Sequence, residues 1–176
     1  MTATKQFLEL VSRGKQGENA FINWCKNNNI EYVDLSDNTY WQKRDVDFAC
    51  RYNGTIKTVE VKTDTRLGQT GNFAIEFYQH YANTYFNSEF GWAFMSKADM
   101  FATYDSINKR LYIYNVNDLL LYCVGYQEKY RFMKFYDKMN SGKTKCRYVE
   151  LMKMQDFVYW CNKYNKPIII EDLKEW

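Results

Sequence analysis

The stretch DVDFACRYNGTIKTVEVK (45–62) decides the fold, because it predicts a β-hairpin closed by Asn53-Gly54. An Asn-Gly pair between two apolar runs favours a two-residue type I′ turn. With that turn, Tyr52 pairs with Thr55, and the two strands cover residues 46–52 and 55–62. The register of every other cross-strand pair follows from this one.

In that register, Asp47 lies opposite Glu60, and Asp45 lies opposite Lys62. Side chains alternate between the two faces of a strand, so these four charges share one face with Ala49 and Thr58. The opposite face carries apolar residues that we expect in the core: Val46, Phe48, Val59 and Val61.

Opposed carboxylates on neighbouring strands repel each other at roughly 5 Å between Cβ atoms. Asp47 and Glu60 make sense as a pair if a divalent cation lies between them, because hard cations prefer carboxylate and carbonyl oxygens. Lys62 reaches the same place and could hold a water or a phosphate oxygen. Two structural alternatives stay open, an ordinary Asp45–Lys62 ion pair worth little and an acidic pair on a solvated face.

A helix is predicted over residues 4–27, ended by three consecutive asparagines. Glu18 falls in the middle of its apolar stripe, and an unpartnered carboxylate there is costly to bury. Gly14 and Gly17 would allow another backbone or a ligand to approach closely. The alternative is that Glu18 lies on a solvated flank. The stripe follows helical spacing and consists of Phe7, Leu10, Val11, Gly14, Glu18, Phe21, Trp24 and Cys25.

The hairpin resembles the core motif of the PD-(D/E)XK nuclease superfamily. Asp47 precedes the strand FACRY, and Glu60-Val61-Lys62 lies on the partner strand, with a 13-residue separation similar to that of the Holliday-junction resolvase branch. That branch and several phage nucleases also carry an acidic residue on the first helix, as GKQGENAF (14–21) does with Glu18. The departure is Val46, which stands where the family has proline and leaves Asp45 as a second choice for the ligand.

The resemblance implies a restriction-endonuclease-like core and a set of roles. Asp47, Glu60 and the Val61 carbonyl would bind Mg²⁺ or Mn²⁺. Lys62 would position or help deprotonate the attacking water, and Glu18 would complete a second metal site or hold a metal-bound water. The product would carry a 5′-phosphate. Enzymes of this fold usually act as dimers, so a homodimer is expected. Members occur in phages, bacteria and archaea.

The remaining pattern predicts a mixed α/β fold with a central mixed sheet flanked by helices, and one domain over 1–176. Asn117 is expected to cap the second predicted helix, and residues 68–72 are expected to form a loop. Strands are expected at 30–35, 72–78, 92–96, 100–105, 110–116 and 167–170, and further helices at 118–124 and 155–164.

Charge is uneven along the chain. The net charge is +3, yet residues 128–153 hold eight Lys and Arg against three acids. Such a segment, with tyrosines and phenylalanines interleaved, is suited to a polyanion; a solvated basic face is the alternative. Candidate DNA contacts are Arg66, Lys97, Lys143, Lys145 and Arg147. Gln79 is a further candidate site residue.

Composition narrows the function classes. Five scattered cysteines without a C-x-x-C pair do not suit a zinc ribbon, and one histidine, His80, gives little support to histidine-rich metal sites. No apolar run approaches the ~20 residues of a membrane span, and no signal segment is apparent, which favours the cytoplasm. A thiol enzyme that uses Cys50 with His80 is a remote third class.

The leading prediction is a Mg²⁺-dependent DNA endonuclease that prefers branched DNA, with a Holliday-junction resolvase as the example. The alternative is a non-catalytic module on the same fold that binds nucleic acid or protein, as an inhibitor would.

Overall fold

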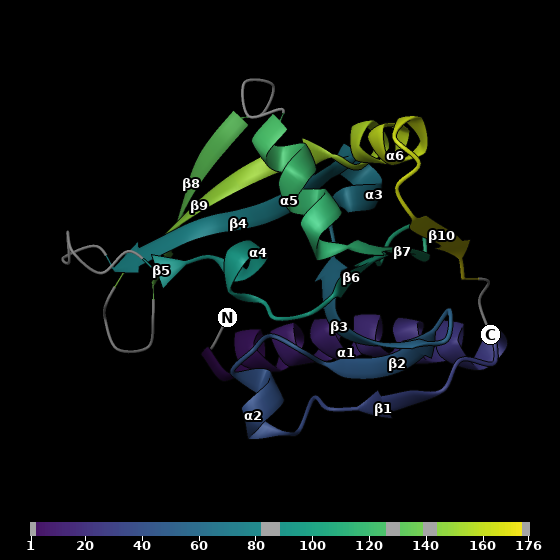
Figure 1. The fold of residues 1–176 in the computed structure, drawn as a ribbon. Helices are drawn as coiled ribbons and strands as arrows, with labels where there is room; N and C mark the ends of the chain where they lie inside the picture. Colours follow the sequence, from purple (N-terminus) through teal and green to yellow (C-terminus); the bar gives the residue numbers. More distant parts are fainter. Residues whose placement is uncertain (1–2, 82–88, 126–130, 139–143, 174–176) are drawn as a thin grey trace.

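The computed structural model describes residues 3–81, 89–125, 131–138 and 144–173. It has a mixed α/β fold with a central mixed sheet flanked by helices, as predicted (Figure 1). No helix in the described part of the chain is long and apolar enough to cross a membrane.

The central sheet has six strands in the order β1-β2-β3-β6-β7-β10. Only the β3–β6 pair is parallel; its neighbours pair antiparallel. The long connection from β3 to β6 contains two strands of a second sheet, β4 and β5, as a parallel pair requires a crossover. The strand bounds are β1 (Tyr32–Asp34), β2 (Phe48–Tyr52), β3 (Thr55–Asp64), β6 (Met100–Asp105), β7 (Arg110–Asn115) and β10 (Ile168–Asp172).

The predicted hairpin register is confirmed. Tyr52 pairs with Thr55, and Phe48 pairs with Val59. Asn53 and Gly54 have φ values of 49° and 74°, the left-handed backbone that both central residues of a type I′ turn need.

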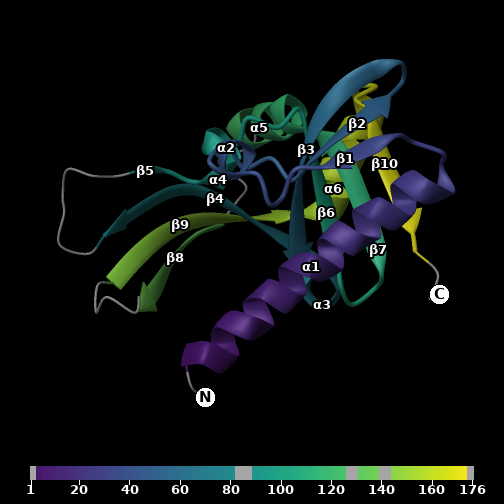
Figure 2. The ribbon, with the colours of Figure 1, turned by 90° about the horizontal axis from the view of Figure 1, so that it is seen from below.

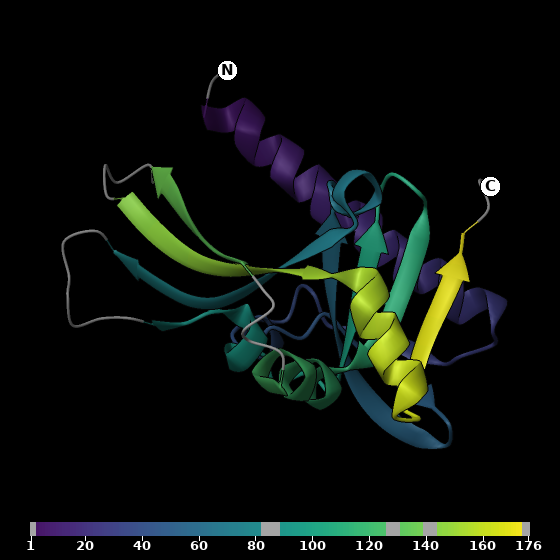
Figure 3. The same ribbon diagram turned by 90° about the horizontal axis from the view of Figure 1, so that it is seen from above.

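A second sheet, which the sequence did not predict, is antiparallel in the order β5-β4-β9-β8 and extends away from the first (Figures 1 and 3). Its inner part shares a core with the first sheet, since Phe73 and Met152 pack in one cluster with Phe101 and Tyr114. The described parts of the basic segment form its strands β8 and β9, which pair antiparallel. Its strands are β4 (Asn72–Tyr81), β5 (Glu89–Phe90), β8 (Arg131–Lys138) and β9 (Thr144–Lys153).

Helices cover both faces of the central sheet. Helix α1 (Ala3–Asn27) lies on one face (Figure 2), and α5 (Val116–Gly125) and α6 (Met154–Lys163) lie on the other (Figure 3). Three single turns complete the fold: α2 (Thr39–Gln42), α3 (Leu67–Thr70) and α4 (Trp92–Met95).

Three local predictions were wrong. The strand expected at 92–96 is instead the helical turn α4 over residues 92–95, held by hydrogen bonds from Met95 N–H and Ser96 N–H to the Gly91 and Trp92 carbonyls, with Ala93 buried. Part of the loop expected at 68–72 is α3, begun by Asp64, whose carboxylate accepts the N–H of Leu67. Asn117 lies inside α5, which begins one residue earlier.

Among the described side chains of α1, the buried ones lie in its second half. Its buried residues follow i, i+3, i+4, i+7 and i+8 spacing and end the helix against the sheet: Gly17, Ala20, Phe21, Trp24 and Cys25. Val11 is 54% exposed and Gly14 is exposed, because the first half of α1 projects past the sheet (Figure 2). Glu18 therefore lies where the helix leaves the core.

Candidate metal-binding and catalytic site

The site lies at the end of the hairpin remote from its turn. Asp47 comes directly before β2, and its N–H donates to the Val59 carbonyl at 2.9 Å. Its carboxylate oxygen Oδ2 accepts the N–H of Val61 at 2.8 Å. This second bond uses a side chain where a strand would use a backbone carbonyl, and it fixes the Asp47 carboxylate beside β3.

Glu60 is the central residue of the site. It is only 5% exposed, and its neighbour on β6 is Phe101, a fully buried ring. The Lys62 Nζ donates to Glu60 Oε1 at 2.5 Å. Glu60 Oε2 is buried and accepts no hydrogen bond from a donor group, and the Glu60 carboxyl lies within hydrogen-bonding range of the Asp47 carboxyl. A buried carboxylate oxygen without a partner is destabilising, so its position has to be explained by something other than folding.

The electrostatics of the three groups are coupled. Burial raises the pKa of Glu60 to about 7, against the opposing effect of Lys62 and with the help of the Asp47 charge. Burial also raises the pKa of Asp47, and the Val61 hydrogen bond opposes it. Burial lowers the pKa of Lys62, but the charge of Glu60 and its hydrogen bond to Lys62 raise that pKa by more, so the pKa of Lys62 is above its ordinary value. Lys62 is therefore an ammonium group at neutral pH.

Glu18 is on α1, which packs on the face of the sheet opposite Glu60 and Lys62, and its charge reaches Asp47. Its side chain is 18% exposed and accepts a hydrogen bond from Lys15 Nζ at 2.6 Å. Its negative charge contributes to the raised pKa of Asp47. The packing of α1 against β3 depends on Gly17, where a Cβ would lie 2.3 Å from Thr63 Oγ1 and 3.1 Å from Val61 Cγ1. Gly17 therefore admits the Thr63 and Val61 side chains rather than the backbone or ligand that was expected, whereas Gly14 has nothing within 4 Å of such a Cβ.

The predicted pairing of Asp45 with Lys62 is wrong. Asp45 has φ of 49° and lies in a turn, where its N–H donates to the Gln42 carbonyl. This left-handed residue also turns Val46 into the cluster on the α5/α6 side of the sheet, not into the α1 side that holds Phe48. Asp45 still affects the site through its charge, which contributes to the raised pKa values of Glu60 and Lys62.

Trp92 is a site residue that the sequence did not reveal. The Lys62 Nζ lies 5.2 Å from the centre of the Trp92 ring, a distance suited to a cation–π contact. The ring is itself fixed by an edge contact with Phe101, at 5.1 Å between centroids. Trp92 is placed beside Lys62 because it begins the helical turn α4. The sequence predicted a strand at 92–96 and therefore did not identify Trp92 as a site residue.

The remaining candidate residues lie away from Asp47, Glu60 and Lys62, or their side chains are outside the described part of the chain. Arg66 and Lys97 are exposed, and the backbone N–H of Lys97 donates to the Arg44 carbonyl. Gln79 and Arg147 are neighbours in the β4–β9 ladder, and Lys145 pairs with Tyr81 there. The side chains of Gln79, His80, Lys145 and Arg147 lie outside the described residues, as does all of Lys143.

Cys50 does not suit the thiol-enzyme reading. It is buried among the residues that face α1, and burial raises the pKa of its thiol to about 11. A reactive cysteine needs the opposite shift.

The donor set suits Mg²⁺ better than a metal that needs a full protein cage. Among the described residues, no group of three or more His, Cys, Asp and Glu side chains is arranged to hold a metal ion. Mg²⁺ keeps several waters and commonly takes only one or two carboxylates. Asp47 and Glu60 supply two, and the unpartnered Glu60 Oε2 offers a hard oxygen for one such bond.

No family model matches the chain, and no curated protein matches it. Solved structures that match include a bacterial homing endonuclease, I-Ssp6803I, with a TM-score of 0.43 and 17% sequence identity over 66% of this chain and 71% of the other. At that similarity the likeness carries no argument about chemistry, which rests on the residues described above.

Proposed function

We propose that the protein is a metal-dependent nuclease of the PD-(D/E)XK type that hydrolyses DNA phosphodiester bonds internally. The observation that carries the proposal is the buried Glu60 carboxylate, which lies with Asp47 and Lys62 and leaves one oxygen without a partner. Folding alone does not reward such an arrangement, whereas a bound cation would satisfy it.

Asp47, Glu60 and the Val61 carbonyl would hold Mg²⁺ or Mn²⁺, and Glu18 would hold a metal-bound water or a second ion. When bound, the ion would neutralise phosphate charge and lower the pKa of a bound water. Glu60 must be ionised to bind it, so its pKa of about 7 makes metal affinity fall below neutral pH.

Lys62 would position the attacking water and stabilise the negative charge that develops on the phosphate. We assign it no role as a base, because its raised pKa keeps it protonated. Water attacks phosphorus, the 3′ oxygen leaves and the product carries a 5′-phosphate. Trp92 would keep the Lys62 amine in place when Glu60 turns toward the metal, since the indole face attracts a cation without a hydrogen bond.

The substrate would be DNA, engaged in part by the basic β8–β9 hairpin and by Arg66 and Lys97. Within this proposal we favour branched DNA and a homodimer that cuts two strands. A sequence-specific or nicking enzyme would use the same catalytic residues.

The test is cleavage of labelled four-way junction, flap, nicked and linear DNA with Mg²⁺, Mn²⁺ or EDTA. We expect metal-dependent products with 5′-phosphate ends, and a loss of about 10³-fold or more in Glu60→Gln and Asp47→Asn. Asp156→Asn is the control, because Asp156 is an exposed carboxylate on α6, outside the hairpin. Equal cleavage by Glu60→Gln and the wild type would refute the assignment of the site.

One observation favours the alternative, a non-catalytic binding module. The short Lys62–Glu60 ion pair already neutralises part of the site without a metal. Calorimetric titration with Mn²⁺ separates the two functions, because the nuclease must bind the ion and Glu60→Gln must weaken that binding. Absence of both metal binding and cleavage on all four DNA substrates would favour the module.

A further inference from the structure

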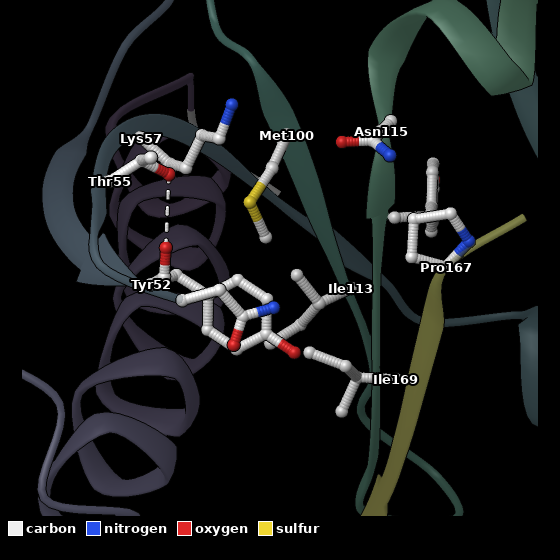
Figure 4. A pocket seen from close by; sticks show the side chains of 10 residues that line it. Tyr52, Thr55, Lys57, Met100, Ile113, Asn115, Pro167 and Ile169 are labelled. Carbon is white, nitrogen blue, oxygen red and sulfur yellow. Dashed lines mark hydrogen bonds between the residues drawn. The ribbon is translucent and has the colours of Figure 1, made fainter.

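A hollow of about 230 Å³ lies at the turn end of the hairpin, beside the ends of β6, β7 and β10 (Figure 4). It is on the side of the sheet that faces α1, because Met100 and Ile113 of its lining belong to the cluster around Phe21 and Trp24. Glu60 and Lys62 lie next to Phe101 and Thr103 on the other side of the sheet. The hollow is therefore separate from the candidate catalytic site.

The hollow exists because the hairpin continues where its neighbour stops. The β3–β6 pairing begins at Val59 and Met100. Just before it, the Asp99 carboxylate accepts both the N–H of Thr58, at 2.8 Å, and the Thr58 hydroxyl, at 2.9 Å. This clamp ends the ladder, so residues 55–57 of β3 extend past β6 and leave a space between the turn and β10. Strand residues, with Asn53 of the turn and Pro167, thus form its walls.

The lining combines an apolar floor with several polar residues, among them Lys57 and Asn115. Met100 is 5% and Ile113 is 1% exposed, and Ile169 and the Tyr52 ring complete the floor (Figure 4). Lys57 lines one rim and Asn115 lies across the hollow from it.

Lys57 is half-buried, yet no carboxylate of the described residues forms an ion pair with it. The Asn115 amide nitrogen donates to Asp118 Oδ2 at 3.1 Å, which leaves the amide oxygen as an acceptor. In Figure 4 that oxygen is on the side of the amide toward Met100. The floor thus has at one side a cation with no carboxylate partner among the described residues, and at the other a hydrogen-bond acceptor.

We propose that this hollow binds a small aromatic carboxylate, with its ring on the Met100–Ile113–Ile169 floor and its carboxylate on Lys57. The volume lies below the ~300 Å³ lower end of drug-sized pockets, so one ring and a short acid arm are the size that fits. An apolar floor with one convergent charge is the usual composition of a small-molecule site. The proposal does not depend on nuclease activity.

Phenylacetate is the probe, with benzyl alcohol and benzylammonium as neutral and cationic analogues of similar shape. Binding is followed on the full chain by NMR of ¹³C-methyl-labelled methionine, with the Met100 signal assigned from Met100→Leu. Met95, which is 48% exposed, and Met154, in the other cluster, are internal controls. We expect a saturable shift of Met100 alone, with a Kd of about millimolar, and none with the ammonium analogue.

Lys57→Gln should weaken phenylacetate binding about tenfold, Lys57→Arg should retain it, and the exposed Lys43→Gln should behave as wild type. Glu60→Gln should bind phenylacetate normally whether or not it cleaves DNA, which separates this proposal from the previous one. The proposal is overturned if Met100 does not shift, or if all three analogues shift it equally. Tighter binding of uridine 5′-monophosphate than of phenylacetate would also overturn it, in favour of a nucleotide site.

Discussion

Two buried carboxylates on neighbouring strands have opposite surroundings. Asp105, at the end of β6, is 1% exposed, and both of its oxygens are hydrogen-bonded. Oδ1 accepts the N–H groups of Ile107 and Asn108, and Oδ2 accepts the Asn108 side-chain amide. Glu60 on β3 is 5% exposed with one oxygen unpartnered. Asp105 is buried to build a turn, whereas Glu60 is buried at a cost to folding that a ligand would relieve.

The largest expected difference between the two carboxylates is the effect of Glu60 on how the free energy of unfolding changes with pH. A carboxyl whose folded-state pKa is raised makes the protein most stable below its ordinary pKa, and that stability is lost as pH rises through the raised value. For Glu60 the window runs from about pH 4.5 to about pH 7. The metal-free protein should lose up to about 3 kcal/mol there, with Asp47 acting in the same direction.

Denaturant unfolding in EDTA from pH 4.5 to 8 measures this loss. Glu60→Gln should flatten the slope and be more stable than wild type at pH 8. Mn²⁺ should stabilise the wild type more at pH 8 than at pH 5.5, and should hardly affect the variant. A wild-type stability that rises across this window would contradict the assignment.

The second effect is that Asp105→Asn should destabilise, the reverse of Glu60→Gln at pH 8. The Asn side chain places an amide donor against the Asn108 amide donor, and charge-assisted bonds to two backbone N–H groups are lost. We expect a loss of about 2 kcal/mol in the free energy of unfolding, with cleavage per folded molecule unchanged. Asp172→Asn is the control, an exposed carboxylate paired with Arg110. Equal stabilities of Asp105→Asn and wild type would remove the contrast.

The third effect tests whether Glu18 depends on helix placement. Gly17→Ala forces a Cβ toward Thr63 Oγ1 and should destabilise by about 1–3 kcal/mol, as well as lower cleavage by moving Glu18. Gly14→Ala, three residues earlier on the exposed half of α1, should instead stabilise by up to about 1 kcal/mol. Thermal unfolding measures the stability of both variants, and cleavage rates on the same samples measure the effect on Glu18. Similar stabilities of the two variants would mean that α1 does not rest closely on β3.

The smallest effect concerns Trp92. Trp92→Leu removes the ring over Lys62 and should reduce kcat by roughly two- to fivefold, in keeping with a contact worth about 0.5–1 kcal/mol. Trp92→Phe should retain most of kcat because an aromatic face remains. Both variants should leave KM nearly unchanged, since the contact positions an amine rather than binds DNA. Equal kcat values in Leu and Phe variants would assign Trp92 to packing alone.

The hairpin shows how much local sequence can specify. Asn53-Gly54 and period-two alternation set the register, and that register places Asp47 next to Glu60 and puts Lys62 on the same strand. These features need only neighbours in the chain and the handedness of a turn. The same reasoning failed at Asp45, because a left-handed φ there depends on the α2 turn, whose carbonyl at Gln42 binds Asp45 N–H.

The sequence by itself determined the hairpin, most of the strands and the acidic pair, because turn chemistry and side-chain alternation act over a few residues. Only the tertiary structure decided that Glu60 is left with an unpartnered oxygen, that Trp92 faces Lys62, and that half of α1 leaves the core. Lys62 and Trp92 are 30 positions apart in the chain. Long-range packing brings them together. No local pattern encodes such contacts, since they exist only once both sheets share a core.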